Sequence, residues 1–328
     1  MTFTSNPADS SPKQIDVFNG DADGLCALQQ LRLHDPSDSQ LITGVKRDSA
    51  LLKRVTAAPG DLITVLDISL DKNRADLERL LAIGARVRYF DHHYAGMIPD
   101  HPLLDAHIDL QPQQGTSLLV NHWLKGQAAA WAIVGTFGDN FDQAAYQLAQ
   151  QLGLNATAAD SLRELGILLN YNGYGATVAD LHFAPDVLFR ALQPYSDPLA
   201  FIAAEPMTMQ LRLGYEADMN HAQQLTPSLV TERHLVLQFP NEPWARRVSG
   251  VFINQLAQQT PQRAHALLTE LTGGEFLISI RAPLAQPTGA DQLARQFVTG
   301  GGRAAAAGIN QLPASDYERF IHAFIAAF

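Results

Sequence analysis

Residues 18–31, FNGDADGLCALQQL, join a predicted strand to a predicted helix. The β-branched and aromatic residues at 15–18 favour a strand, and apolar residues recur at helical spacing over 25–33. The turn between them carries Asp21 and Asp23. An Asp-Gly pair is typical of an ordinary turn when taken alone, but the position of Asp23 directly after an apolar strand favours a functional site at the strand end.

The same pattern continues along the first half of the chain. Further strands are predicted at 41–45, 62–66 and 87–90, with a helix at 74–83. Strands that alternate with helices are typical of a mostly parallel sheet flanked by helices. After residue 116 the pattern becomes largely helical, with predicted helices at 117–124, 128–137, 143–152 and 161–169.

Prolines separate this half from the next. Residues 185–231 contain Pro185, Pro194, Pro198, Pro206 and Pro227, which interrupt short periodic pieces and predict an irregular connecting segment. A second α/β pattern follows. Its predicted strands are 234–238, 265–269 and 276–280, and its predicted helices are 247–258, 291–297 and 317–328.

These patterns predict an α/β protein of two domains, and we expect an active-site cleft between them. The larger N-terminal domain has a mostly parallel sheet flanked by helices, and the C-terminal domain is a smaller α/β unit. The predicted divisions are a flexible polar leader at 1–13, a first domain at 14–184, a connecting segment at 185–231 and a second domain at 232–328. A length of 328 residues fits two domains better than one.

Composition and charge restrict the class of partner. The net charge of -10 argues against binding of long DNA through an extended basic face, but allows a short anionic ligand in a local pocket. The single cysteine, Cys26, excludes an intramolecular disulfide and a multi-cysteine zinc site, as expected in a reducing compartment. The N-terminus does not resemble a signal peptide, and no apolar run approaches the roughly 18 residues that cross a bilayer. We therefore expect a soluble, cytoplasmic protein with no membrane partner.

Acidic and imidazole side chains follow three of the predicted strands. The carboxyl ends of parallel strands meet at one edge of a sheet, so these side chains should lie close together. They are Asp21 and Asp23 in FNGDADG, Asp67 in TVLDIS, and Asp91, His92 and His93 in RYFDHHY, while Asp139, at the end of a predicted helix in GTFGDN, could reach the same place.

Several carboxylates in one place repel one another. We expect no cation among them, so the cluster requires a compensating positive charge, which one or two divalent metal ions would supply. Mixed carboxylate and imidazole ligands favour Mn²⁺, with Mg²⁺ or Co²⁺ as substitutes.

A polar and aromatic cluster closes the first predicted domain. Its members are Asn170, Tyr171, Asn172, Tyr174 and Asp180. The sequence leaves open whether this cluster is a hinge, a dimer contact or part of the site, and it equally leaves open whether the chain forms a homodimer.

Five motifs together resemble those of a known superfamily. In this order and at these separations, FNGDADG, VLDIS, FDHHY and GDN resemble the four motifs of the DHH phosphoesterases. The segment GGGRAAAAG, residues 300–308, resembles the signature GGGHxxAAG of the DHH-associated domain in RecJ exonucleases, nanoRNases and cyclic-dinucleotide phosphodiesterases. The likeness runs from residue 15 to the end of the chain. A lone DxD would be weak evidence, but five ordered motifs are specific.

The resemblance implies a role for each matching residue. In the first domain, Asp67 would bridge two metal ions. Asp23, His92 and Asp139 would complete one metal site, Asp21 would belong to the other, Asp91 would orient His92, and His93 would face the scissile phosphate. In the second domain, the substrate-binding residues would be Arg281, Gly300, Gly301, Gly302 and Arg303. The three glycines precede an alanine-rich stretch, which also predicts an anion-binding nest at a helix N-terminus.

The sequence departs from the family pattern at three positions. Val17 stands where nanoRNases carry a histidine, and Asn19 stands where RecJ enzymes carry an aspartate. The first metal site would therefore be weaker, completed by Asn19 or a water molecule, or absent. Arg303 replaces the histidine of the glycine-rich signature. Its planar, permanently charged guanidinium would still bind a phosphate, but the identity of the substrate stays open.

Three functions follow from these observations. The first is hydrolysis of phosphodiester bonds in short oligonucleotides, dinucleotides or related nucleotide phosphates through a metal-activated water. The second is hydrolysis of a phosphoanhydride or a phosphomonoester. The third is a nucleotide-binding regulator with a degraded first metal site. The expected partner is a short nucleic acid or a small nucleotide.

Overall fold

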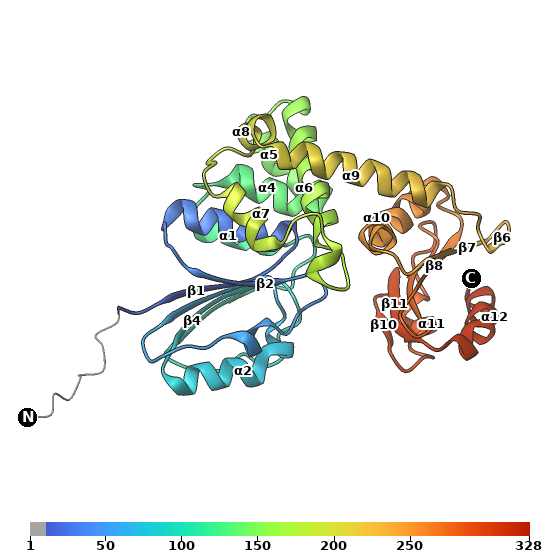
Figure 1. The fold of residues 1–328 in the computed structure, drawn as a ribbon, viewed down its shortest axis with the longest axis horizontal. Helices are drawn as coiled ribbons and strands as arrows, with labels where there is room; N and C mark the ends of the chain where they lie inside the picture. The colour runs from blue at the N-terminus through green and yellow to red at the C-terminus, as the bar shows by residue number, and fades with distance from the viewer. Residues whose placement is uncertain (1–10) are drawn as a thin grey trace, which may run out of the picture. The chain divides into compact units, whose positions relative to one another are not determined.

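The computed structural model describes residues 11–328. Residues 1–10, most of the predicted leader at 1–13, lie outside the described residues. The chain divides into two compact units, Met1–Leu211 and Arg212–Phe328 (Figure 1).

The first unit is built on a parallel sheet. Its five strands are β1 (Gln14–Asn19), β2 (Gln40–Gly44), β3 (Leu62–Leu66), β4 (Arg86–Asp91) and β5 (Leu104–Ile108), in the order β2-β1-β3-β4-β5. All neighbouring strands pair in parallel. The first four strands match the predicted ones. Strand β5 was not predicted, because in its sequence, LDAHI, polar residues alternate with apolar ones and none of the five is fully buried.

Helices cover both faces of this sheet. Helix α2 (Leu70–Ile83) lies on one face together with the short 3-10 helix η1 (Leu51–Arg54), whereas α1 (Ala22–His34) lies on the other (Figure 1). The remaining helices of this region are α3 (Thr116–Trp123), α4 (Ala129–Gly138), α5 (Asp142–Gln151), α6 (Ala156–Gly173) and the 3-10 helix η2 (Val178–Asp180). Helix α4 packs against α1 and α6 and is buried along almost its whole length.

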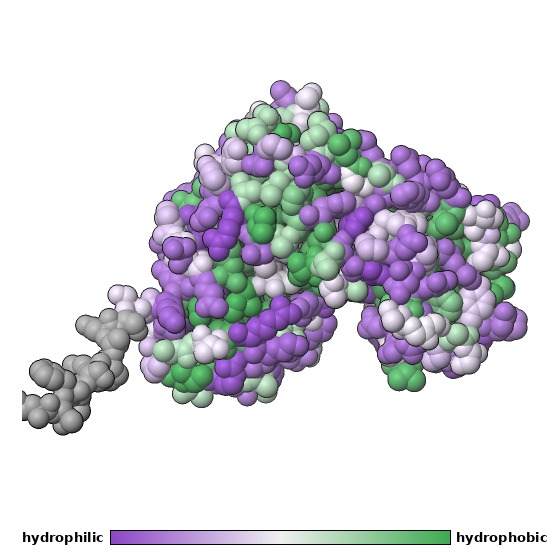
Figure 2. Space-filling view, viewed as in Figure 1, coloured by the Kyte–Doolittle hydropathy of each residue, from purple (hydrophilic) through white to green (hydrophobic). Residues whose placement is uncertain are grey.

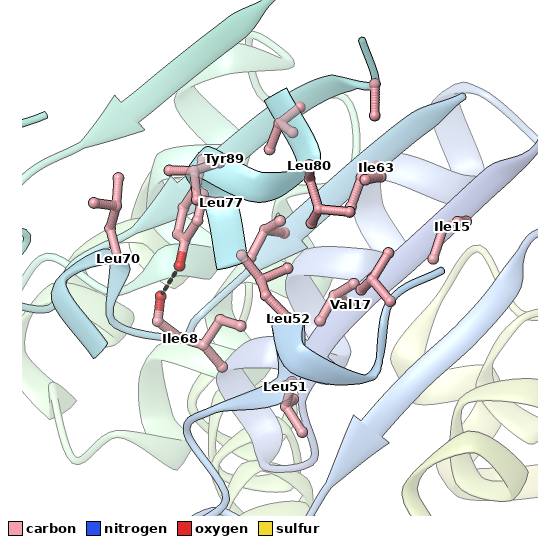
Figure 3. Packing of buried hydrophobic residues seen from close by; sticks show 14 of the residues in the cluster. Ile15, Val17, Leu51, Leu52, Ile63, Ile68, Leu70, Leu77, Leu80 and Tyr89 are labelled. Carbon is pink, nitrogen blue, oxygen red and sulfur yellow. Dashed lines mark hydrogen bonds between the residues drawn. The ribbon is translucent and has the colours of Figure 1, made fainter. Parts of the chain in front are cut away.

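The core between the sheet and α2 consists of aliphatic side chains from alternating strand positions. Val17 of β1 lies beside Leu52 of η1, and the ring of Tyr89 of β4 lies beside Leu77 of α2 (Figure 3). The Tyr89 hydroxyl donates a hydrogen bond of 2.7 Å to the carbonyl of Ile68. Val17, the position where nanoRNases carry a histidine, is fully buried in this core and offers no ligand atom.

The predicted irregular segment at 185–231 is mostly helical, so that prediction was wrong. It forms α7 (Pro185–Leu192), α8 (Pro198–Ala204) and α9 (Pro206–Gln223). Each helix begins with a proline. A proline at the first helical position needs no hydrogen-bond acceptor and has a suitable φ, so these prolines start helices instead of breaking them. The division between the two units falls within α9.

The second unit contains a mixed sheet. Its strands are β6 (Leu229–Val230), β7 (His234–Phe239), β8 (Ala264–Glu270), β9 (Phe276–Arg281), β10 (Gly300–Gly302) and β11 (Ala306–Leu312), in the order β10-β11-β9-β8-β7-β6. Only β7 and β8 run parallel. Its helices are α10 (Pro243–Gln259), α11 (Ala290–Ala294), α12 (Tyr317–Ala327) and the 3-10 helix η3 (Ala314–Asp316). The predicted fold class, a larger parallel-sheet domain followed by a smaller α/β domain, is confirmed.

The glycine-rich segment is a β-hairpin, so the predicted helix N-terminus is wrong. Strand β10 pairs antiparallel with β11, and Arg303 and Ala306 exchange backbone hydrogen bonds of 2.9 and 3.1 Å at the turn. A Cβ at Gly300 would lie 1.7 Å from the carbonyl oxygen of Ala294, whereas a Cβ at Gly301 would meet no atom within 4 Å. The close backbone approach at Gly300 explains that glycine, but packing does not explain Gly301.

Hydrophilic residues cover most of the visible face of both units, and hydrophobic residues lie among them in smaller groups (Figure 2). Among residues 11–328, no helix is long and apolar enough to span a membrane.

Candidate metal centre

Neighbouring strands deliver the predicted site residues to one edge of the parallel sheet. Asp21 and Asp23 follow β1, Asp67 follows β3, and Asp91 ends β4. The chain leaves β1 toward α1 and leaves β3 toward α2, and these helices cover opposite faces of the sheet (Figure 1). Ligand sites of open α/β sheets form where adjacent strands diverge in this way.

Four of the predicted metal ligands come together at this edge. Asp23, Asp67, His92 and Asp139 each offer one ligand atom, and these atoms all lie within 4.8 Å of one another. The Nε2 atom of His92 is 3.4 Å from Asp67 Oδ1, 3.4 Å from Asp139 Oδ2 and 3.9 Å from Asp23 Oδ2. Three carboxylates around one imidazole fit a divalent ion such as Mn²⁺.

Asp23 is fixed by the first turn of α3. The backbone N–H groups of Thr116 and Ser117 donate to its two carboxylate oxygens at 2.6 and 2.8 Å, and the Ser117 hydroxyl donates to its carbonyl oxygen at 2.9 Å. Gly115 permits this approach, because a Cβ there would lie 3.1 Å from the carboxylate. The N-terminus of α3 therefore fixes the orientation of the Asp23 side chain and favours its ionised carboxylate.

Asp67 has an unusual backbone conformation. Its φ of 61° lies in the left-handed region, which costs a non-glycine residue roughly 1 kcal/mol. Its N–H donates to the carbonyl of Phe90 at 3.0 Å, and Thr116 Oγ1 donates to Asp67 Oδ1 at 3.1 Å. Such strain persists where the surrounding structure enforces it, and it occurs most often at functional sites.

The buried carboxylates perturb each other's protonation. Burial, followed by the charges of Asp21 and Asp23, raises the pKa of Asp67 well above its usual range. Burial and the charge of Asp139 raise the pKa of Asp23 to about 6. Burial lowers the pKa of His92, but its hydrogen bond and charge interaction with Asp67 outweigh burial and raise that pKa to about 10. The cluster therefore holds protons that a divalent ion would displace.

Asp91 contacts His93, whereas the sequence-based expectation was that it orients His92. Asp91 Oδ1 lies 2.8 Å from His93 Nδ1. Asp91 is fully buried, while the His93 side chain is 46% exposed. Because its neighbour His92 already faces three carboxylates, the buried carboxylate of Asp91 orients the more exposed ring.

Lys46 is the site residue that sequence reasoning missed. It lies two residues after β2, and its ammonium forms an ion pair with Asp21 Oδ2, lies 3.1 Å from Asp139 Oδ1 and donates to Asn170 Oδ1 at 3.0 Å. The expectation that no cation lies among the carboxylates is therefore wrong. The signal was its position, because Lys46 follows the second strand much as Asp21 follows the first. Asn170, from the polar and aromatic cluster, belongs to this site.

Asp21 and Asn19 do not join the four-ligand group. Burial raises the pKa of Asp21, but the charge and hydrogen bond of Lys46 outweigh burial and lower that pKa overall. Asn19 Nδ2 donates to the backbone carbonyl of Lys46 at 3.4 Å, and its Oδ1 is buried without a hydrogen-bond partner in the described part of the chain.

The predicted substrate-binding residues lie in the second unit. Arg281, in β9, donates from Nε to Asn254 Oδ1 at 2.8 Å. Arg303 is exposed at the hairpin turn, and within residues 11–328 its guanidinium has no hydrogen bond or ion pair. Contact of these residues with a substrate stays a prediction.

Comparison of the chain with known proteins gives structural matches only. No family model and no curated protein matches it. The structure of RecJ from Thermus thermophilus with Mn²⁺ matches with a TM-score of 0.62 and 21% identity, and the match covers 96% of this chain and 52% of that one. This chain thus spans about half the length of that RecJ.

Two further structures match over nearly the whole of this chain. An exonuclease RecJ bound to manganese has a TM-score of 0.56 and 21% identity, with 96% of this chain and 89% of that one covered. PggH, a pGpG-specific phosphodiesterase from Vibrio cholerae, has a TM-score of 0.56 and 15% identity, with 96% and 98% covered. The resemblance predicted from the motifs is thereby confirmed at the level of the fold, and the chain has the RecJ-like two-domain fold.

Proposed function

We propose that the chain is a metal-dependent phosphoesterase that hydrolyses phosphodiester bonds of short oligonucleotides, dinucleotides or related nucleotide phosphates. The observation that carries this proposal is the four-ligand group of Asp23, Asp67, His92 and Asp139 at the end of the parallel strands. Asp23 and Asp67 are at most 1% exposed, so their mutual repulsion is not relieved by solvent. A bound cation would offset this repulsion, whereas packing alone gives no reason to bury these carboxylates together.

Mn²⁺ is the proposed ion. The ligand set mixes carboxylate oxygens with an imidazole nitrogen, which suits a borderline ion, and the two RecJ structures compared above contain manganese. When bound, the ion would lower the pKa of a water molecule and neutralise charge that develops on the phosphate.

The residues around the ligands have separate tasks. Asp23 is held by the N-terminus of α3, and Asp67 by its strained backbone and by Thr116. Asp91 engages Nδ1 of His93, which leaves Nε2 of the exposed ring to contact a substrate phosphate. Arrangement of these groups before the substrate binds lowers the cost of reaching the transition state.

The proposed substrate class rests on three supports. The matched structures include an exonuclease and a pGpG-specific phosphodiesterase. The net charge of -10 disfavours a long polyanion. The free guanidinium of Arg303 provides a second phosphate-binding group. A short nucleotide ligand agrees with all three.

One observation favours a second candidate, a nucleotide-binding regulator with little turnover. Lys46 contacts Asp21, the residue predicted to bind the first metal ion, and this contact favours a centre without the full two-metal arrangement that the family resemblance implies. The two candidates differ in a single property, which is whether bound nucleotide is cleaved.

The test is hydrolysis by purified protein with Mn²⁺. End-labelled RNA and DNA of two to five nucleotides, pyrophosphate and a nucleoside monophosphate would be incubated in parallel with and without the metal. The proposal predicts Mn²⁺-dependent release of mononucleotides from the short oligonucleotides. Binding without cleavage would support the regulator, and cleavage of pyrophosphate or the monophosphate alone would support the anhydride or monoester hydrolase.

A matched pair of variants separates the metal centre from general effects. Asp139→Asn keeps the shape of a proposed ligand but removes its charge, and it should abolish turnover. Asp142→Asn changes an aspartate at the start of α5, where it pairs with Arg163, and it should retain turnover. Equal activity of the two variants would contradict the assignment of the centre.

A further inference from the structure

We propose that Lys46 replaces one of the two metal ions, so that the centre binds a single divalent ion per chain and uses the lysine ammonium as its second positive group. This inference rests on the proposed metal-dependent function, and it concerns how the same centre is charged and organised. The family resemblance implied two metal ions, and the residues of this chain do not fit the first metal site, the one to which Asp21 would belong.

Each N–H group of the Lys46 ammonium has an acceptor. The ammonium has three N–H donors, and three oxygen atoms receive them, from Asp21, Asp139 and Asn170. The backbone N–H of Lys46 also donates to the carbonyl of Gly173 at 2.8 Å. A lysine fixed at both its backbone and its tip is a built part of the centre, in contrast to a mobile surface charge.

Lys46 and the backbone use both oxygens of Asp21. Asp21 Oδ1 accepts from the N–H groups of Asp23 and Gly24, each at 3.1 Å, and Oδ2 pairs with Lys46. Asp21 is accordingly absent from the groups of described residues that could hold an ion. The carboxylate predicted to bind the first metal ion is already satisfied.

Val17 and Asn19, the positions where family members carry a histidine or an aspartate, also lack a charged metal ligand. Val17 lies in the aliphatic core, and Asn19 offers only a neutral amide. A divalent ion beside Asp21 would therefore find no second carboxylate from these positions, and it would be repelled by the adjacent ammonium. Val17 and Asn19 therefore weaken the same metal site whose carboxylate, Asp21, pairs with Lys46.

Lys46 also positions a ligand of the remaining ion. Asp139 turns Oδ1 toward the ammonium and Oδ2 toward His92 Nε2, at 3.1 and 3.4 Å. The lysine thus fixes the rotation of the Asp139 carboxylate. One divalent ion and the Lys46 ammonium together offset most of the negative charge of the four carboxylates, so the centre needs no second metal ion.

Metal stoichiometry tests this proposal directly. The metal-free 328-residue chain would be titrated with Mn²⁺ by calorimetry, and the bound ion would be examined by electron paramagnetic resonance. We expect one Mn²⁺ per chain and the hyperfine pattern of an isolated ion. Two ions per chain with an exchange-coupled spectrum would overturn the proposal even if the protein hydrolyses oligonucleotides. Failure to bind Mn²⁺ at all would instead overturn the proposed function.

Variants at Lys46 provide the second arm. Lys46→Ala removes the ammonium and frees Asp21, so we expect a second Mn²⁺ to bind with a coupled spectrum, more weakly than the first because Val17 and Asn19 add no charged ligand. Lys46→Arg keeps the charge and should stay at one, as should Lys72→Ala, which alters an exposed lysine of α2. A folded Lys46→Ala protein that binds one Mn²⁺ with wild-type affinity would contradict the proposal. If Lys46→Ala does not fold, the wild-type stoichiometry decides.

Discussion

Replacement of Asp67 by glycine and by alanine should separate its backbone strain from its role at the centre. Its φ of 61° suits glycine but costs alanine roughly 1 kcal/mol. Both substitutions remove the carboxylate and its hydrogen bond from Thr116, so these losses cancel in the comparison. Asp67→Gly should therefore be more stable than Asp67→Ala by about 1 kcal/mol, which corresponds to roughly 2 to 4 °C in Tm for a unit of this size.

The assay is thermal unfolding, first with a chelator and then with Mn²⁺. At about 100 times Kd, the ion should stabilise the wild-type protein by roughly 2.7 kcal/mol, because it binds only the folded state. Both Asp67 variants should lose this gain together with turnover. They should nevertheless remain folded without metal, since substitution also removes a carboxylate that is repelled by Asp21 and Asp23.

Two results would refute this reasoning. Equal melting temperatures for Asp67→Gly and Asp67→Ala would show that the left-handed backbone stores no strain. Stabilisation by Mn²⁺ or oligonucleotide hydrolysis at the wild-type level in either variant would show that Asp67 is not a ligand. Asn140→Gly is a useful control, because Asn140 also has a φ of 61° but lies outside the four-ligand group. Asparagine tolerates a left-handed φ better than alanine does. Asn140→Gly should therefore raise the free energy of unfolding by less than the difference between Asp67→Gly and Asp67→Ala.

Four other predictions follow. The pKa of His92 near 10 means that Mn²⁺ must displace its proton, so affinity should fall as pH falls, and calorimetry in buffers of different ionisation enthalpy should detect proton release; no release would contradict the ligand set. Burial lowers the folded-state pKa of His265 to about 4, below the usual 6.5. The free energy of unfolding should therefore be full above pH 6.5 and decline by up to about 3 kcal/mol as pH falls toward 4. His265→Gln should flatten this decline in chemical unfolding, and an unchanged pH profile would exclude His265 as its cause. Arg303→Ala should raise KM for a dinucleotide by about tenfold or more, the value of a charge-assisted contact, while bis-p-nitrophenyl phosphate hydrolysis stays the same; equal losses on both substrates would place Arg303 at the chemistry or in the fold. Gly300→Ala should destabilise the second unit because its Cβ has no room, whereas Gly301→Ala should leave Tm unchanged; similar melting curves would contradict the packing argument.

Much of the first unit could be predicted because its signals are local. Strands β1 and β3 are largely buried, and β2 and β4 also carry short apolar runs that favour a strand. Parallel strands end at one edge of the sheet, so the convergence of Asp23, Asp67 and His92 followed from their positions after strands. Strand β5 lacked that signal because Asp105 and His107 interrupt its apolar residues. Helices α7, α8 and α9 were missed because a proline in the sequence can mark either the start or the interruption of a helix.

The contacts of long side chains were harder to predict. Lys46 reaches Asp139 and Asn170, which are far away in sequence, and no periodicity records that contact. Whether Asp91 contacts His92 or His93 likewise depends on the path of the backbone after β4, which the sequence pattern does not indicate. Strand β10 consists of three glycines, which have no β-propensity of their own, and it forms because β11 pairs with it.

The most direct test of the metal centre is anomalous diffraction at the manganese edge from a crystal of the full chain grown with Mn²⁺. We expect one strong peak in contact with Asp23, Asp67, His92 and Asp139, with the ammonium of Lys46 still beside Asp21. A crystal saturated with Mn²⁺ that shows no peak among these four side chains would contradict the central claim that they form a metal site.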